Sequence, residues 1–172
     1  MSEPATDHRA AFLALYDDVL PDVYGYLLRR CGSSALAEDL TSETFIAAID
    51  AMRRDRVPSM TVAWLITVAR NKMVDHWRRV AREDRMLEAV DGAAVAHDDV
   101  WDVVLDVAAA HGTLARLGPH HRCALTLRYL DGLPVRDVAA ALGRTVGATE
   151  VLLVRSRRAF RDLHVDVDRE EH

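Results

Sequence analysis

The chain has 172 residues, half of them hydrophobic and only 6% aromatic, and its formal net charge is −5. This length fits one medium domain or two very small ones, and the apolar content excludes wholesale disorder. Two cysteines, Cys31 and Cys123, are too few for a disulfide framework or a cysteine zinc site. No apolar run reaches the roughly 18 residues of a membrane span, and Met1 to Arg9 has no signal-peptide pattern. We therefore expect a cytoplasmic chain with no metal, no cofactor and no membrane insertion.

The net negative charge argues against a nucleic-acid partner, but it averages over opposing segments. Residues 64–85 carry +3 and residues 113–163 carry +5, whereas residues 86–112 contain six acidic and no basic side chains. Low aromatic content and abundant Ala, Leu and Arg favour helices. The sequence predicts an all-α fold of two small domains, with these boundaries: domains at 8–85 and 111–163, a flexible acidic linker at 86–110 and an acidic tail at 164–172.

Helical periodicity runs through the first predicted domain. Apolar residues recur at three- and four-residue steps over 12–27, with Pro21 expected to bend or restart that helix. Gly32 stops it, and the serines that follow are N-cap candidates for a second helix over about 35–53. After a polar loop, Ser59 or Thr61 can cap a third helix that ends near Arg85.

The third predicted helix combines an apolar stripe with a mostly basic face. The stripe has four-residue spacing: Leu65, Ala69, Met73 and Trp77. The polar face carries Asn71, Asp75, Arg78, Arg79 and Arg82. Such a face can follow phosphates, and Trp64 and Trp77 can stack on unpaired bases. A solvated face with core tryptophans has the same pattern, so both interpretations stay open.

The second predicted domain ends in the spacing of a helix-turn-helix. A helix over 120–129, bounded by Gly118-Pro119 and Asp131-Gly132, comes first. Pro134 then starts a short helix that ends at Gly143, and a longer helix follows from near Val146 to about Leu163. Ala139, four residues before Gly143, leaves room for two helices to cross closely. An ordinary helical hairpin has the same pattern, and this spacing alone does not separate the two.

Three long motifs resemble those of one protein family. Ala37–Phe45 reads AEDLTSETF and resembles the AEDLTQETF of sigma factor region 2.2, and Ala63–Arg79 resembles the AWLxxIARNxxxDxxRR of regions 2.3 and 2.4. Leu114–Leu163 resembles region 4, with its LRYxxGLSxxEIAxxLG. Their order and spacing are similar to those of extracytoplasmic-function (ECF) sigma factors, which keep only regions 2 and 4.

This resemblance implies a promoter-specificity subunit of bacterial RNA polymerase. Its partners would be core RNA polymerase, through the β′ clamp and the β flap, promoter DNA and an anti-sigma factor. The chain would recognise the −35 and −10 elements and melt the −10 region, while the chemistry belongs to the polymerase.

The resemblance also assigns site residues. The expected polymerase-binding residues are Glu38, Asp39, Glu43 and Thr44. The helix dipole alone would also favour acidic side chains in the first turns of this helix. The expected −10 contacts are Arg54, Arg56, Trp64, Asn71, Lys72, Asp75, Arg78, Arg79 and Arg82, with an unpaired base captured by the loop over 53–60. The expected −35 contacts are Arg136, Arg144, Thr145, Val146, Thr149, Glu150, Leu153, Arg155, Arg157 and Arg158.

The sequence departs from the family pattern in the last helix. Where the family has GTVKSRLxRAR, this chain has GATEVLLVRSR over 147–157. Glu150 replaces a basic residue, and a glutamate accepts a hydrogen bond from cytosine N4 where an arginine reads guanine. Either the −35 sequence differs from that of arginine-bearing relatives or this surface contributes less to DNA affinity. The sequence leaves both open.

Two rival functions fit parts of the sequence. A stand-alone helix-turn-helix regulator would bind duplex DNA without polymerase. An enzyme is disfavoured because the adjacent carboxylates, Asp17-Asp18 and Asp98-Asp99, have no partnered nucleophile motif and no phosphate-binding loop is present. A redox role for the cysteines is also disfavoured, since one buried cysteine per domain is ordinary.

Overall fold

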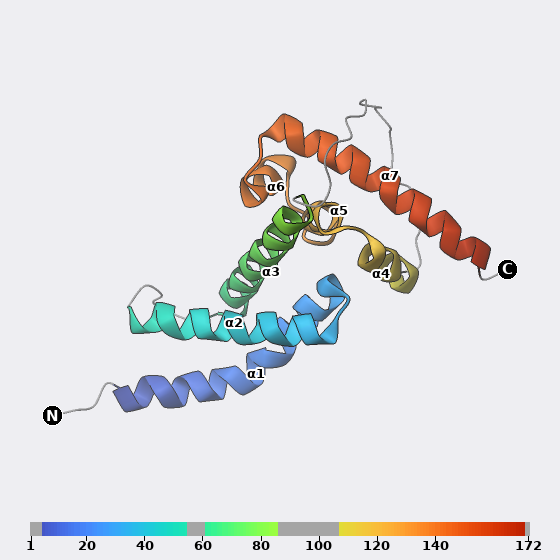
Figure 1. Cartoon of the computed structure of the whole chain (residues 1–172). Coiled ribbons are helices and arrows are strands. Elements are labelled where there is room, and N and C mark those ends of the chain that lie inside the picture. Colours follow the sequence, from blue (N-terminus) through green and yellow to red (C-terminus); the bar gives the residue numbers. More distant parts are fainter. Residues whose placement is uncertain (1–4, 55–60, 86–106, 171–172) are drawn as a thin grey trace. The chain divides into compact units, whose positions relative to one another are not determined.

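Every regular element that the structure describes is a helix, so the all-α prediction is confirmed (Figure 1). The computed structural model describes residues 5–54, 61–85 and 107–170. The chain divides into two compact units, 1–73 and 74–172, and the division falls inside the third helix. The expected linker lies mostly outside the described residues, so the expected domain boundaries stay a prediction.

The first two helices form one apolar interface. Helix α1 (Ala5–Cys31) runs unbroken through Pro21, which is exposed, so water can serve the carbonyl that a proline leaves without a partner. Helix α2 (Ser34–Arg53) begins after Ser33, whose hydroxyl accepts a hydrogen bond from the Leu36 N–H at 3.4 Å. The rings of Tyr16 and Phe45 meet edge to face at 4.6 Å between the two helices. The buried α1 residues recur at helical spacing: Val19, Val23, Tyr26, Leu27 and Cys31.

Helix α3 (Val62–Arg85) is amphipathic as predicted. The Thr61 hydroxyl accepts from the Trp64 N–H at 3.2 Å and so provides the cap expected from Thr61 or Ser59. The predicted stripe of Leu65, Ala69, Met73 and Trp77 is buried, with 3% exposure or less. Each such large side chain contributes about 1.5–3 kcal/mol relative to an exposed one. This burial turns the polar side of the helix outward.

The remaining helices pack around the last one, α7 (Val146–Glu170). The others are α4 (Val107–Arg116), α5 (Pro119–Leu125), the π-helical turn η1 (Thr126–Leu130) and α6 (Val135–Leu142). Helices α4, α5 and α6 each contact α7. Their shared core contains Leu114, Leu117, Ala124, Leu125, Leu152, Leu153 and Phe160. Helix α7 continues past its predicted end near Leu163, so part of the expected tail is helical.

A π-helical turn ends the helix that the sequence predicts over 120–129. The Asp131 N–H donates to the Thr126 carbonyl at 3.0 Å, one residue beyond α-helical register. Gly132, with φ +67°, then reverses the chain, as the predicted stop requires. The wider turn leaves Tyr129 and Leu130 exposed at 44% and 39%.

The connection between α6 and α7 has the predicted helix-turn-helix form. Gly143 adopts the left-handed conformation, φ 63° and ψ 40°, and the Arg144 N–H donates to the Ala139 carbonyl at 2.9 Å. Ala139 is buried, as a close approach of two helices requires. Thr145 caps α7, because its hydroxyl accepts from the Ala148 N–H at 3.2 Å.

Candidate functional site

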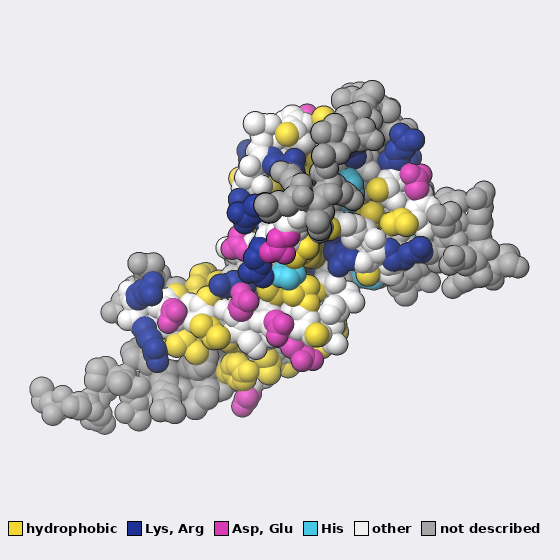
Figure 2. All heavy atoms as spheres, viewed as in Figure 1, with side chains coloured by type: hydrophobic (Ala, Val, Ile, Leu, Met, Phe, Trp, Pro, Cys, Tyr) yellow, Lys and Arg dark blue, Asp and Glu magenta, His cyan; other side chains and the backbone are white. Residues whose placement is uncertain are grey.

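An exposed strip of α2 carries three carboxylates around one large apolar side chain. Asp39, Glu43, Ile46 and Asp50 are all exposed, Ile46 at 61%, and at about 100° per residue they lie within roughly 60° of arc. We call this strip the acidic α2 face. Figure 2 shows Asp and Glu side chains interleaved with hydrophobic ones along α2. Glu38 is also exposed, to one side of the strip.

Two members of the acidic α2 face were missed from the sequence, and of the expected residues Glu38 lies beside the strip and Thr44 is not exposed at all. Ile46 and Asp50 follow Asp39 at steps of seven and eleven residues, a helical spacing that is visible in the sequence. Thr44, expected on the surface, is fully buried and donates its hydroxyl to the Leu40 carbonyl at 2.7 Å. Its place on the polymerase-binding surface is therefore corrected, because a buried side chain cannot meet a partner.

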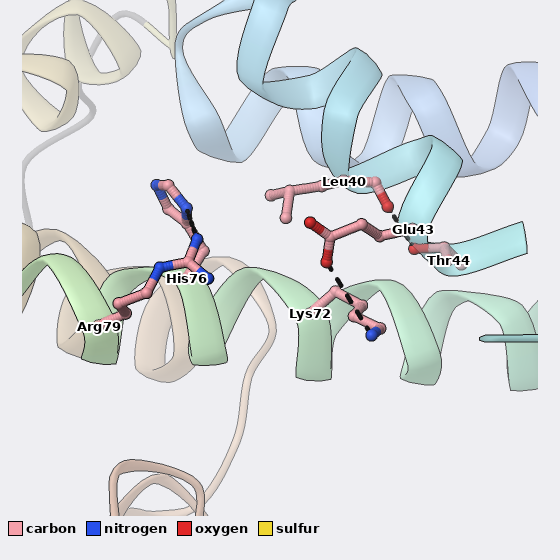
Figure 3. A network of polar contacts seen from close by, with 6 residues as sticks. All are labelled: Leu40, Glu43, Thr44, Lys72, His76 and Arg79. Carbon is pink, nitrogen blue, oxygen red and sulfur yellow. Dashed lines mark hydrogen bonds and ion pairs between the residues drawn. The ribbon is translucent and has the colours of Figure 1, made fainter. Parts of the chain in front are cut away.

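The polar side of α3 presents a charged surface, which we call the basic α3 face. It comprises Asn71, Asp75, Arg78, Arg79 and Arg82, all exposed. A carboxylate oxygen of Asp75 lies 4.0 Å from Arg78 Nη1, and Arg82 Nε donates to the Arg78 carbonyl at 3.1 Å. Arg79 Nη2 donates to His76 Nδ1 at 3.2 Å (Figure 3). The arginines of this face are exposed, so their guanidinium groups can meet phosphates.

Two residues expected to serve different partners face each other. A Glu43 carboxylate oxygen lies 3.9 Å from Lys72 Nζ, with side-chain exposures of 51% and 34% (Figure 3). This pair joins α2 to α3. Lys72 is thus less available to an outside phosphate than the exposed arginines of the basic α3 face, although an ion pair this exposed is weak.

The other expected −10 residues have mixed environments. Arg54 is exposed and directly follows α2, whereas Arg56 and the rest of the loop over 55–60 lie outside the described residues. Trp64 is half-buried, so part of its side chain remains accessible to a partner. Trp77 is buried, which favours its interpretation as a core residue.

Five of the expected −35 residues lie around the turn between α6 and α7. Arg136 is exposed at the start of α6, with Nε 3.4 Å from the neighbouring Asp137 carboxylate. Arg144 is half-buried within the turn, and Thr145 is exposed as the cap. Val146 is 46% exposed and Glu150 is exposed one turn later. This turn and the first part of α7 form the surface on which a recognition helix would meet base edges.

Two expected −35 residues face inward instead. Thr149 is fully buried and donates its hydroxyl to the Thr145 carbonyl at 2.9 Å, and Leu153 is 4% exposed within the core. Neither side chain can contact DNA in this fold, so both assignments are corrected. They recur with Leu152 and Ser156 on the side of α7 that packs against the other helices.

Basic residues of α7 begin only at its middle. Arg155 and Arg158 are exposed, and Arg157 is half-buried and donates to the Tyr129 hydroxyl at 3.1 Å. That bond ties α7 to the π-helical turn. Arg155 and Arg158 are therefore the expected −35 residues of α7 best placed for phosphates.

Side chains from α5 fix the position of α7 and the end of α4. His121 Nδ1 and Ser156 Oγ are 2.8 Å apart, and Ser156 donates to the Leu152 carbonyl at 2.7 Å, so the histidine is the donor to the serine. Burial, and secondarily the charge of Arg155, lowers the pKa of His121, which favours the neutral ring. Arg122 donates to the carbonyls of Leu114, Ala115 and Leu117 and so serves the orphan carbonyls at the end of α4.

The cysteines are buried thiols. Both are free, and burial raises the pKa of Cys123 to about 12, far from the range of a reactive thiolate. In the described part of the chain, no group of three or more His, Cys, Asp or Glu side chains is placed to hold a metal ion. None of the described helices is long and apolar enough to cross a membrane.

Known proteins match both halves of the chain. Family models for sigma-70 region 2 and sigma-70 region 4 match residues 15–83 and 108–160. The ECF RNA polymerase sigma factor BldN of Streptomyces coelicolor is 36% identical over 91% of this chain, which spans only 61% of that relative. The ECF RNA polymerase sigma factor SigL of Mycobacterium tuberculosis is 32% identical over 94% of this chain and 93% of its own length.

One solved structure is similar over most of its length. It is the sigma factor RpoE in complex with the anti-sigma factor NepR, from Bartonella quintana. The similarity has a TM-score of 0.51 and 25% identity, and it covers 89% of this chain and 96% of that one.

Proposed function

This chain belongs to the sigma-70 family and is similar throughout to its ECF members, and from that premise we propose that it directs core RNA polymerase to promoters. It would recognise the −35 and −10 elements, separate the strands at −10 and leave RNA synthesis to the polymerase. It would act in the cytoplasm, where the polymerase works, and would itself catalyse no reaction.

The acidic α2 face is the proposed contact for the β′ clamp of the polymerase. Three carboxylates on one rigid helix suit a basic partner surface, and their charge would accelerate the encounter. Ile46, at 61% exposure in the middle of this strip, supplies the apolar centre that stable interfaces need within a polar rim. Its burial against the clamp would contribute more to affinity than any single exposed carboxylate.

The basic α3 face is the proposed contact for the −10 element. Three exposed arginines follow the helix and can hold phosphates of a separated strand, while Asn71 can reach a base edge. Asp75 would act indirectly, since its carboxylate lies 4.0 Å from Arg78 and is repelled by DNA. The half-buried Trp64 would stack on an unpaired base near the start of the same helix.

Helices α6 and α7 are the proposed reader of the −35 duplex. The turn at Gly143 and the cap at Thr145 present the first part of α7 to the major groove. Arg136, Arg155 and Arg158 are exposed around this surface and would hold phosphates. The β flap would bind the same unit, and the 86–110 segment would tether it to the first.

An anti-sigma factor is the proposed regulator. The sigma factor of similar fold is in complex with one. A protein that covers the acidic α2 face would block the proposed polymerase contact, and one that covers the basic α3 face would block the proposed −10 contact. One face is acidic and the other is basic, so a partner with basic and acidic patches would find complementary charge on both.

One observation carries the proposal above the others: a single chain holds both an exposed arginine row on α3 and a helix-turn-helix. Run-off transcription tests it, with core RNA polymerase and a template library randomised upstream of a fixed start. We expect promoter-dependent product only when core enzyme and this chain are both present. If no template gives such product, the proposed function is wrong.

The rival, a stand-alone regulator, makes a different prediction for the free chain. It requires tight, sequence-specific binding to duplex DNA without polymerase. The match of α1–α3 to sigma-70 region 2 disfavours it, since a regulator of that kind has no use for such a unit. Electrophoretic mobility shifts with the same library, with and without core enzyme, separate the two.

A further inference from the structure

The first part of α7 presents a surface without positive charge. Residues 146–154 include no lysine or arginine. Their inward side is buried at Thr149, Leu152 and Leu153, so the outward side consists of Val146, Gly147, Ala148 and Glu150, with Val151 and Val154 half-buried. Any base edge that meets this part of α7 therefore meets valine methyl groups and a single carboxylate.

The Glu150 carboxylate is available to an outside donor. Among the described residues it has no hydrogen bond and no ion pair, and it is exposed. Its helical neighbours at steps of four are Val146 and Val154, and neither can neutralise it. The nearest basic residues along the helix, Arg155 and Arg157, are five and seven positions away. A structural ion pair thus does not account for this glutamate.

Weak DNA affinity alone does not account for it either. Arg136, at the start of α6, has an 81% exposed side chain, and Arg155 and Arg158 are exposed further along α7. Phosphate contacts by such groups supply affinity and register but no sequence information. The residues of the reading surface, such as Glu150 and Val146, would then determine which base is preferred and need not contribute to affinity.

The chemistry of a carboxylate selects one base in the major groove. Guanine offers two acceptors there and thymine O4 offers one, and each repels a carboxylate oxygen. Adenine places an acceptor, N7, beside its single amino donor. Cytosine presents the N4 amino group with no acceptor on its own major-groove edge, and it is the base that a carboxylate ordinarily reads. The adjacent Val146, 46% exposed, offers methyl groups that suit the C5 methyl of thymine.

We propose that Glu150 is the specificity-determining residue of the −35 reader and selects cytosine through the N4 amino group, with Val146 favouring a thymine beside it. The proposal rests on the proposed function. A basic residue at this position would prefer guanine. Glu150 would instead prefer cytosine on the same strand.

The test is the base preference of the holoenzyme. Core RNA polymerase is assembled with the full chain and given templates with a fixed −10 element and a randomised −35 region. Each template carries, downstream of the start, a barcode that identifies its −35 sequence, and the barcodes in the transcripts are sequenced. The wild-type chain should enrich cytosine at one position by tenfold or more. Glu150→Ala should remove that enrichment, and Glu150→Gln should shift it to adenine, whose N6 and N7 match an amide.

A matched control is Asp162→Ala, which removes an exposed carboxylate from the far part of α7 and should leave the enrichment unchanged. Because Glu150 is exposed, its variants should melt at the wild-type temperature, which circular dichroism checks. The same base enrichment in wild-type and Glu150→Ala transcripts would overturn the assignment. Failure of the proposed function has a different signature, because then no variant gives promoter-dependent transcripts at all.

Discussion

The two surfaces proposed to meet DNA differ in their charge. The basic α3 face carries three exposed arginines within five residues, whereas the first nine residues of α7 carry none and present Glu150 instead. Separating two strands requires a surface that holds the backbone of the released strand, and arginines do this without regard to sequence. Reading an intact duplex requires discrimination at base edges. The difference teaches that a net charge of −5 does not oppose the proposed DNA contacts, because the cations are concentrated where the backbone would be held.

The strongest way to break this contrast is to remove the charge of α3. Arg78→Ala together with Arg79→Ala should lower promoter-dependent transcription about 100-fold, since each charge-assisted contact contributes about 1.5 kcal/mol or roughly tenfold. The rate of run-off product is the measurement. The control pair, Arg29→Ala with Arg116→Ala, removes two exposed arginines elsewhere and should retain full activity. Equal loss in both pairs would remove the special role of the basic α3 face.

A second experiment asks whether the acidic α2 face belongs to the polymerase rather than to DNA. Ile46→Arg should weaken binding to core enzyme about 30-fold, because a buried apolar anchor contributes about 2 kcal/mol and the arginine also opposes a basic partner. Fluorescence anisotropy with labelled chain measures the dissociation constant. Val62→Arg alters another exposed apolar residue, on α3, and should leave core affinity intact. An unchanged dissociation constant for Ile46→Arg contradicts the assignment.

A third experiment makes α7 resemble α3. Glu150→Arg should raise the affinity of the free chain for unrelated duplex DNA about tenfold, through one added phosphate contact. The gain should vanish as salt is raised, because released counterions drive it. Titrations of a labelled duplex at two salt concentrations give the answer. If Glu150→Arg binds unrelated duplex no better than the wild type, the acidic character of this surface does not limit DNA binding.

Lys72 provides a finer comparison within α3. Because it is half-buried and lies 3.9 Å from Glu43, Lys72→Gln should reduce transcription only about threefold, much less than Arg79→Ala. The Glu43→Gln and Lys72→Gln double-mutant cycle should give a coupling below about 1 kcal/mol in unfolding free energy. A loss for Lys72→Gln as large as that for Arg79→Ala would mean that the pair opens when DNA binds.

The smallest expected effect is on the pH dependence of stability, and it concerns the contact between His121 on α5 and Ser156 on α7. Because burial lowers the pKa of His121, the unfolded chain binds more protons just below pH 6.5, so stability should fall as the pH drops from 6.5 to the lowered value. His121→Asn keeps a donor for Ser156 and should lose this pH dependence. Urea midpoints at pH 7.5 and 5.5 measure it. An identical drop for wild type and variant assigns the effect to other groups.

Local signals allowed much of the fold to be predicted. The structure has the two expected helix caps, at Ser33 and Thr61, and the expected turn at Gly143. Each of these features depends only on residues close by in the sequence. The π-helical turn at Thr126–Leu130 was not predicted, because its register depends on how α5 packs against α7. Nothing in the local sequence separates it from an ordinary helix end.

The exposure of the candidate site residues was predicted well where helical phase was considered and poorly where position in a motif was used alone. The basic α3 face came from offsets along one helix, and all five members are exposed. Thr44, Thr149 and Leu153 came from motif positions, and all three are buried. Their phase already groups Thr44 with Leu40 and Ala48, and Thr149 with Leu152 and Leu153. Ile46 was missed because an exposed isoleucine has no polar signal.

The central claim is that this chain opens promoter DNA only as part of RNA polymerase. Permanganate footprinting of unpaired thymines tests it directly on a promoter recovered from the run-off library. With core enzyme and chain together, thymines in the −10 region should become reactive, and with either one alone they should not. Reactivity with the chain alone, or none with both, would contradict the account.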